Sequence, residues 1–426
     1  FDGASFGAGG QYETLSGRAF GELDPKHPRN VIIQYIRLAP VNARGMVEYV
    51  ATFHVVKPID MSKASGLIWH DVPNRGRRVV IPAAERAMGD VGLSSGWQGD
   101  NAGNTAPGPN NDWVTVPIAR NPDGSTITGQ VLARIINRSG PHSQPLIVQT
   151  NPVPSKPTTH DTRQAVLVSR AHESIDGKVT GEKKILHTDW AWARCGGEHP
   201  PFPGTPDDHH ICLKHGFNAK LAYQLVYTAK GPYVLGVGFA AFRDVASFFK
   251  YAAKDDEGTP NPVAGTVTWT ISRGQSQSGN FLRQLIHLGF TQDESNRKVY
   301  DGAWPIIAGK RIALNVRFGM PDGAQKLYEA GAEGPQWWTD WPDTVRGLPT
   351  KGILDRCTAT NTCPKIIEHF GSAEAWGLNL SAGFVGTSAD KDIPLPANVR
   401  RYYIPSTADR KSTRLNSSHI PLSRMP

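Results

Sequence analysis

The stretch that most restricts the fold spans residues 266–290, where a strand, a tight turn and a helix follow one another without a linker. The run TVTWTIS is rich in β-branched residues, which is typical of a strand. The helix that begins near Gly279 carries apolar side chains at helical spacing, and these form one buried face: Phe281, Leu282, Leu285 and Ile286. A sharp turn in this context lifts its central side chain above a sheet and can mount a nucleophile there.

Two serines lie in this turn, and the steric limits of such a turn favour the first as the nucleophile. Strand and helix nearly touch at the positions two before and two after the central residue, so only small residues fit there. For Ser276 these positions hold Gly274 and Ser278, whereas for Ser278 the second would hold the larger Asn280. We therefore assign the nucleophile to Ser276 and one oxyanion donor to the backbone N–H of Gln277. The alternative is a serine that only caps the helix.

The rest of the chain is predicted to form a mainly parallel sheet flanked by helices, which is the α/β class. An amphipathic helix covers residues 239–251. Strand patterns occur at residues 30–40, 45–56, 66–72, 126–137, 266–272, 302–308, 364–370 and 399–405. A loop-rich stretch covers 92–125, and from residue 155 we expect strands to alternate with helices.

Charge and hydropathy exclude two classes of partner. The net charge of +8 includes +3 from residues 409–426, and the other Lys and Arg residues are scattered, so we expect no nucleic-acid partner. A membrane helix needs about 18 consecutive apolar residues. The sequence has no such run, so we expect no membrane span. The chain begins at Phe1, and the lack of a visible signal peptide therefore excludes nothing.

The four cysteines fall into two local pairs, Cys195 with Cys212 and Cys357 with Cys363. Neither pair has the C-x-x-C spacing of zinc or redox sites. We predict two disulfides that staple loops, and with them an oxidising compartment, so that the protein is secreted or periplasmic. The alternative is four free thiols in a cytoplasmic protein.

Several motifs in order resemble one family of α/β-hydrolase fold, the alpha/beta hydrolase domain proteins. The motifs are VPNRG from residue 72, GFAAFRDVASFFKY from residue 238, GQSQSGNFLRQLIHLGF from residue 274 and YDGAWPIIAGKR from residue 300. The resemblance covers residues 20–407, and it implies a serine hydrolase, with carboxylic esters as the expected substrates. It also implies an N-terminal β-rich segment, 1–60, packed on an α/β-hydrolase domain, 61–408, with lid-type insertions near 195–215 and 320–350.

In this fold the catalytic acid follows the nucleophile along the chain and holds the imidazole of a catalytic histidine in one tautomer. The run GSAEAW after the strand at 364–370 resembles the family's acid motif and points to Glu374. Glu368 lies inside the strand and is a poorer candidate, and Asp392 is the second choice. The alternative for Glu374 is an ordinary carboxylate at a helix start.

The second oxyanion donor is expected from the loop after an earlier central strand. The loop PNRGRR fits, which gives backbone N–H groups from Asn74, Arg75 and Gly76; the alternative is a plain Asn/Gly turn. Trp97 and Gln98 are candidate pocket residues. Trp338 is a third, in a run with Trp337 and Trp341 that is either a stacking platform or lid residues packed on the sheet.

The histidine of the triad is expected just after the strand at 399–405, and the sequence departs from the family there. After Thr407 the runs DRKSTRLNSSH and SRMP resemble the translation of a sequencing-adapter oligonucleotide. We expect residues 409–426 to be a non-native, disordered tail, the catalytic histidine to be missing, and this chain to be inactive or nearly so. His419 is then a chance residue. The alternative is a genuine disordered tail.

The remaining cluster of metal-ligand residue types lies between the first two cysteines and just beyond: His199, Asp207, Asp208, His209, His210 and His215. It lies on a Pro-rich loop without helical spacing, so we expect a structural or lid loop and no metal or cofactor. The predicted function is ester hydrolysis through an acyl-enzyme, on a small-molecule or polymer-borne ester. The alternatives are an amidase, peptidase or carbohydrate esterase on the same fold, or a non-catalytic binding protein.

Overall fold

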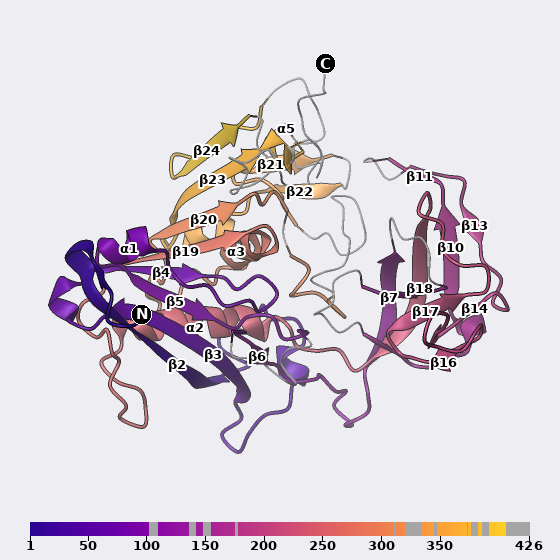
Figure 1. Cartoon of the computed structure of the whole chain (residues 1–426), viewed down its shortest axis with the longest axis horizontal. Helices are drawn as coiled ribbons and strands as arrows, with labels where there is room; N and C mark the ends of the chain where they lie inside the picture. Colours follow the sequence, from indigo (N-terminus) through magenta and orange to yellow (C-terminus); the bar gives the residue numbers. More distant parts are fainter. Residues whose placement is uncertain are drawn as a thin grey trace.

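The computed structural model describes residues 1–101, 110–135, 142–147, 155–174, 178–310, 312–319, 334–344, 347–372, 374–375, 382–385 and 392–405. Its main feature is a ten-stranded sheet (Figure 1). Nine strands form a continuous order: β1 (Ser5–Phe6), β2 (Gly10–Leu23), β3 (Val47–Pro58), β5 (Val91–Ser95), β4 (Leu67–Asp71), β19 (Trp269–Gln275), β20 (Gly302–Ile306), β23 (Lys365–Gly371) and β24 (Val399–Ile404). The tenth, β6 (Val114–Thr115), pairs with β3.

The direction of the strands divides this sheet into two parts. β5, β4, β19, β20, β23 and β24 are parallel neighbours, so their C-terminal ends meet at one edge. β1, β2, β3 and β6 pair antiparallel, and β3 joins them to β5. The N-terminal strands therefore extend the main sheet itself. The C-terminal edge of the parallel part is where open α/β sheets place their ligand sites.

Two helices pack side by side against one face of the sheet. They are α2 (Val237–Tyr251) and α3 (Gln277–His287), and the helices α1 (Ala83–Ala87), α4 (Asp355–Ala359) and α5 (Ala382–Val385) are short. The ring centroids of Phe239 on α2 and Phe281 on α3 are 4.7 Å apart, and Phe242 on α2 lies 3.6 Å from the ring of His70 on β4. Burying each such phenylalanine stabilises the fold by about 1.5–3 kcal/mol.

A second group of strands lies between β6 and α2 in the sequence and forms a separate lobe, magenta to pink in Figure 1. Its larger sheet contains β13 (Lys183–Lys184), β10 (Val166–Arg170), β18 (Ala222–Lys230), β7 (Thr128–Ile135) and β9 (Lys156–Pro157), and its smaller one β14 (Trp190–Ala191), β17 (His210–Leu213) and β8 (Ser143–Pro145). Short two-stranded pairs complete it: β11 (His172–Glu173) with β12 (Val179–Thr180), and β15 (Ala193–Arg194) with β16 (Thr205–Pro206).

The sequence-based prediction for this lobe was wrong in one respect. Strands were expected to alternate with helices from residue 155, but no α-helix occurs between 155 and 236 in the described part of the chain. The longest of these strands, β18, alternates buried and partly exposed residues along its length, which is the period of a strand and not of a helix. The short segments pair antiparallel instead.

The strand predicted over 30–40 was also wrong. This segment forms turns and one 3-10 helix, η2 (Ile36–Leu38), which starts after Tyr35 with φ of 67°. The side-chain amide of Asn30 donates to the backbone oxygen of Asp24 and to Glu294, and these hydrogen bonds stabilise the turn. In contrast, β5 lies at the start of the stretch expected to be a loop.

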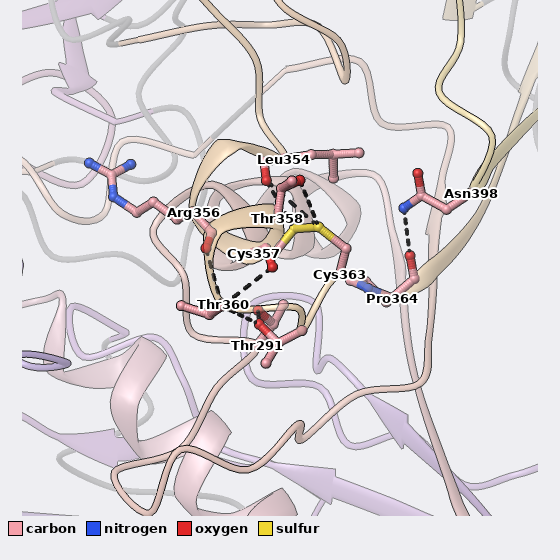
Figure 2. The surroundings of a disulfide bond; sticks show 10 residues. Thr291, Leu354, Arg356, Cys357, Thr358, Thr360, Cys363, Pro364 and Asn398 are labelled. Atoms are coloured by element: carbon pink, nitrogen blue, oxygen red, sulfur yellow. Dashed lines mark hydrogen bonds between the residues drawn. A yellow bond between two sulfur atoms is a disulfide. The ribbon is translucent and has the colours of Figure 1, made fainter.

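Both predicted disulfides are present. Cys195 pairs with Cys212 in the second lobe, and Cys357 pairs with Cys363 next to the main sheet (Figure 2). The second disulfide links α4 to the segment that leads into β23, and Thr291 Oγ1 lies 2.9 Å from Thr362 Oγ1 beside it. Within the described residues no helix is long and apolar enough to cross a membrane.

The core histidine His70 makes the stability of this fold depend on pH. The side chain is buried, its Nε2 lies 2.8 Å from Ser95 Oγ, and its Nδ1 lies 3.3 Å from the Tyr300 hydroxyl. Burial holds the pKa of His70 well below its usual range. Below a pH of about 6.5 the unfolded chain therefore binds a proton that the folded chain does not.

We expect the free energy of unfolding to fall as the pH drops below about 6.5, by about 1.4 kcal/mol per pH unit from His70 alone. Urea unfolding of the protein and of His70→Phe, compared between pH 7.5 and pH 5, measures this contribution. Burial also lowers the pKa of His54 and His209, so the comparison with the variant isolates His70. An identical loss in both proteins would contradict the assignment.

Candidate active site

Ser276 occupies a sharp turn between β19 and α3. Its backbone has φ of 59° and ψ of −117°, a region that residues other than glycine rarely adopt and that costs about 1–3 kcal/mol. Its N–H donates to the carbonyl oxygen of Ile306 at the end of β20 (2.9 Å), and its carbonyl oxygen accepts from Asn280 N–H in α3 (2.9 Å). The side chain of Ser276 is exposed at the C-terminal edge of the parallel strands.

The turn closes because small residues surround it. A Cβ atom on Gly274 would lie 2.5 Å from the backbone oxygen of Ser278, and one on Gly279 would lie 2.5 Å from Ala308 Cβ. The strand and the helix thus meet backbone to backbone. Ser278 is fully buried, and its Oγ has no hydrogen-bond partner among the described residues. Ser276 is therefore exposed and Ser278 is buried, so only the hydroxyl of Ser276 is accessible from the solvent side of the turn.

The loop after β4 lies beside this turn. The side-chain amide of Asn74 donates to the backbone oxygen of Gln275 (3.1 Å), and Arg75 Nη1 donates back to Asn74 Oδ1 (2.8 Å). Arg75 has a φ of 52°, and Gly76 has one of 82°. Because β4 and β20 flank β19, the loop and the end of β20 border Ser276 from two sides. Gln277 opens α3, where backbone N–H groups point out of the helix.

The candidate pocket residues are all buried. Trp97 is 1% exposed, and its Nε1 donates to the backbone oxygen of Pro73 (2.6 Å), so it supports the loop before Asn74 from inside. Gln98 is buried next to it. Trp338 is also 1% exposed, and the guanidinium of Arg283 lies 4.4 Å from its ring centroid. Trp97 and Trp338 pack inside the protein, and contact with a substrate stays a prediction.

Glu374 lies three residues beyond β23, at the same edge of the sheet as Ser276. Its carboxylate accepts a hydrogen bond from the backbone N–H of Gly371 (2.9 Å), and the residue is 3% exposed. β20 separates β23 from β19, so the segment of Glu374 is two strands away from the serine turn. A buried carboxylate at this edge is in a suitable place to orient an imidazole above the strand ends.

The two other candidates for the catalytic acid, Glu368 and Asp392, differ from Glu374 in their burial and in their partners. Glu368 is fully buried on β23, where Oε2 accepts from Arg283 Nη1 (3.0 Å) and Oε1 accepts from Arg401 Nε (2.6 Å). Both oxygens are thus engaged by guanidinium groups. Burial lowers the pKa of Arg283 to about 10. Asp392 is exposed before β24.

Removing the carboxylate of Glu368 leaves two guanidinium groups without their partner, and Arg283 is buried. We expect Glu368→Leu to lower the free energy of unfolding by about 3–5 kcal/mol. The matched control is Glu182→Leu, which removes an exposed partner of Arg170 and should cost at most about 1 kcal/mol. Urea unfolding measures the loss of unfolding free energy in both variants. Equal losses would show that the buried contacts of Glu368 contribute no more to stability than the exposed ion pair of Glu182.

Sequence reasoning missed two asparagines that position the loops of the site. Asn280 Oδ1 accepts from Lys310 N–H (3.0 Å), which ties α3 to the segment after β20. Asn101 Nδ2 donates to the backbone oxygen of Arg75 (2.6 Å). The only signal for either was the preference of asparagine for loops and helix starts.

Within the described residues no hydrogen bond joins the hydroxyl of Ser276 to a histidine. His70 lies in the core, and His369 Nδ1 accepts from Trp304 Nε1 (3.1 Å). Residues 406–426, which include His419, lie outside the described residues.

Two aspartates of the candidate metal cluster in the second lobe each pair with a histidine, and one of these histidines, His160, is not a member of the cluster. His210 Nδ1 lies 2.9 Å from Asp207, and His160 Nε2 lies 2.8 Å from Asp208. Arg194 binds Asp207 as well (2.8 Å). Across the described ranges no three residues of metal-ligand type form a group that could hold an ion.

Comparison with known proteins places the chain in a family. A family model described as "Alpha/beta hydrolase domain" matches residues 106–421 of the chain. The match includes the serine turn and Glu374, and it begins after the loop of Asn74. No curated protein and no solved structure matches the chain.

Proposed function

Because the chain belongs to the alpha/beta hydrolase domain family, we propose that it hydrolyses carboxylic esters through an acyl-enzyme on Ser276. The observation that carries this proposal is the strained, exposed conformation of Ser276 at the strand-to-helix turn. In a nucleophile elbow this conformation holds the hydroxyl above the sheet, in reach of a substrate carbonyl. The family supports hydrolase chemistry, and the choice of esters is our proposal.

In this mechanism the Ser276 oxygen attacks the ester carbonyl, and negative charge develops on the carbonyl oxygen. The backbone N–H of Gln277 and one N–H from the Asn74–Gly76 loop donate to that oxygen. Such donors are fixed before the reaction, and one of them is worth about 3–4 kcal/mol in the transition state. The hydrogen bond from Asn74 to Gln275 keeps the two donors in register.

In the natural protein, where we expect a catalytic histidine to follow β24 in place of residues 409–426, that histidine takes the proton of Ser276 and passes it to the leaving alcohol. Glu374 accepts a hydrogen bond from this imidazole and stabilises its protonated form. The same histidine then removes a proton from water, which attacks the acyl-enzyme and releases the carboxylic acid, and the proton returns to Ser276.

An active-serine probe tests the proposal directly. A fluorophosphonate should label the natural protein once, and peptide mapping should place the label on Ser276. Parallel assays with p-nitrophenyl esters and matched anilides should show faster hydrolysis of the esters. A label on Ser278, or no label together with no ester turnover, would overturn the assignment.

We extend the proposal to fold and location. The main sheet with α2 and α3 represents an α/β-hydrolase domain, and the segments near 195–215 and 320–350 act as lid-type insertions. Of the second segment, residues 320–333 and 345–346 lie outside the described part. The two disulfides are compatible with secretion, and we propose a secreted or periplasmic protein.

A further inference from the structure

The segments after three neighbouring strands contain non-glycine residues with positive φ. Arg75 lies four residues beyond β4 with φ of 52°, Ser276 directly follows β19 with 59°, and Ile307 directly follows β20 with 45°. The first two belong to the proposed oxyanion loop and nucleophile. Ile307 has no such role, although a β-branched residue is the costliest choice in this region and glycine or asparagine would be cheaper.

The surrounding contacts fix Ile307 beside the serine turn. The residue before it, Ile306, accepts the hydrogen bond from Ser276 N–H, and the residue after it, Ala308, packs against Gly279 of α3. The N–H of Ile307 itself donates to the backbone oxygen of His369 on β23 (2.9 Å). Ile307 is thus held from both sides, one residue away from a direct contact with the proposed nucleophile.

Exposure distinguishes Ile307 from its neighbours. Ile306 and Ala308 are 0% and 1% exposed, whereas Ile307 is only half-buried. Ile307 therefore leaves part of an apolar side chain exposed close to the exposed turn of Ser276. Strained backbone conformations of this kind cluster where a binding site needs a side chain in one place.

We propose that Ile307 is a specificity-determining residue that forms an apolar wall beside Ser276 and limits the size of the acyl group that the site accepts. This inference rests on the proposed ester hydrolysis. A β-branched side chain has few rotamers, so the wall is stiff. The side chain of Ile307 would contact the part of the acyl chain next to the carbonyl. Because this space is limited, the site favours short, unbranched acyl groups.

The test compares Ile307→Gly and Ile307→Phe with the natural protein. The ratio of kcat/KM for p-nitrophenyl octanoate to that for the acetate should rise about tenfold in the first and fall about tenfold in the second. Ile307→Gly should melt within a few degrees of the natural protein, because the loss of apolar burial is offset by relief of the positive φ. Asn296→Gly is the control: it replaces another positive-φ residue, six residues before the start of β20, and should leave the ratio unchanged.

The outcomes separate this inference from the function on which it rests. If the natural protein shows Ser276-dependent turnover and neither Ile307 variant changes the ratio, the wall does not exist and the proposed function stands. If no turnover depends on Ser276, the function fails and the inference falls with it. Opposite shifts in the two variants, with the control unchanged, support the inference.

Discussion

Replacing Ser276 by alanine should lower kcat for ester hydrolysis by about a million-fold, because the nucleophile cannot be replaced by a neighbour. The change removes one oxygen from an exposed side chain and leaves the turn in place, so the melting temperature should stay close to that of the natural protein. The measurement is kcat with a p-nitrophenyl ester, together with a thermal melt.

Ser278→Ala is the matched control for this prediction. Its hydroxyl is buried without a partner among the described residues, and alanine fits the same small space. We expect this variant to keep its turnover and its stability. Loss of activity in Ser278→Ala with activity retained in Ser276→Ala would reverse the assignment of the two serines.

Replacing Glu374 by glutamine should lower kcat by about 10³–10⁴-fold. The amide has the shape of the carboxylate and can still accept from Gly371 N–H, but it cannot stabilise a protonated imidazole. Stability should change little, so a loss of turnover without a loss of melting temperature identifies a role in the reaction.

Asp392→Asn is the control, because Asp392 is the second candidate and lies exposed before β24. If Asp392→Asn loses turnover and Glu374→Gln keeps it, the acid is Asp392. Glu368 is distinguished from both by its expected effect on unfolding.

Local patterns in the sequence predicted the parts of the fold whose signals are local. The alternation in β3 and the apolar face of α2 each arise within one segment, and both elements were found. β5 was missed because all five of its residues are buried, so it shows no alternation. Its pairing with β3 and β4 depends on residues elsewhere in the chain.

The same distinction holds at the candidate site. The steric limits that favour Ser276 over Ser278 as the nucleophile act within five residues, so a local pattern is enough to make this prediction. Glu368 is ranked below Glu374 from its place inside the strand alone. The arginines that engage it lie 85 and 33 residues away in the sequence, so no local pattern could predict that contact. The positive φ of Ile307 has no sequence signal, since isoleucine is among the residues least suited to it.

The disulfide between Cys357 and Cys363 lies at one end of β23, and Glu374 lies beyond the other. Closing so short a loop removes about 2 kcal/mol of chain entropy from the unfolded state. We therefore expect reduction of this disulfide to lower the free energy of unfolding, and to leave kcat unchanged because the proposed acid lies at the other end of the strand. On this proposal, a change at one end of β23 alters stability and a change at the other end alters turnover.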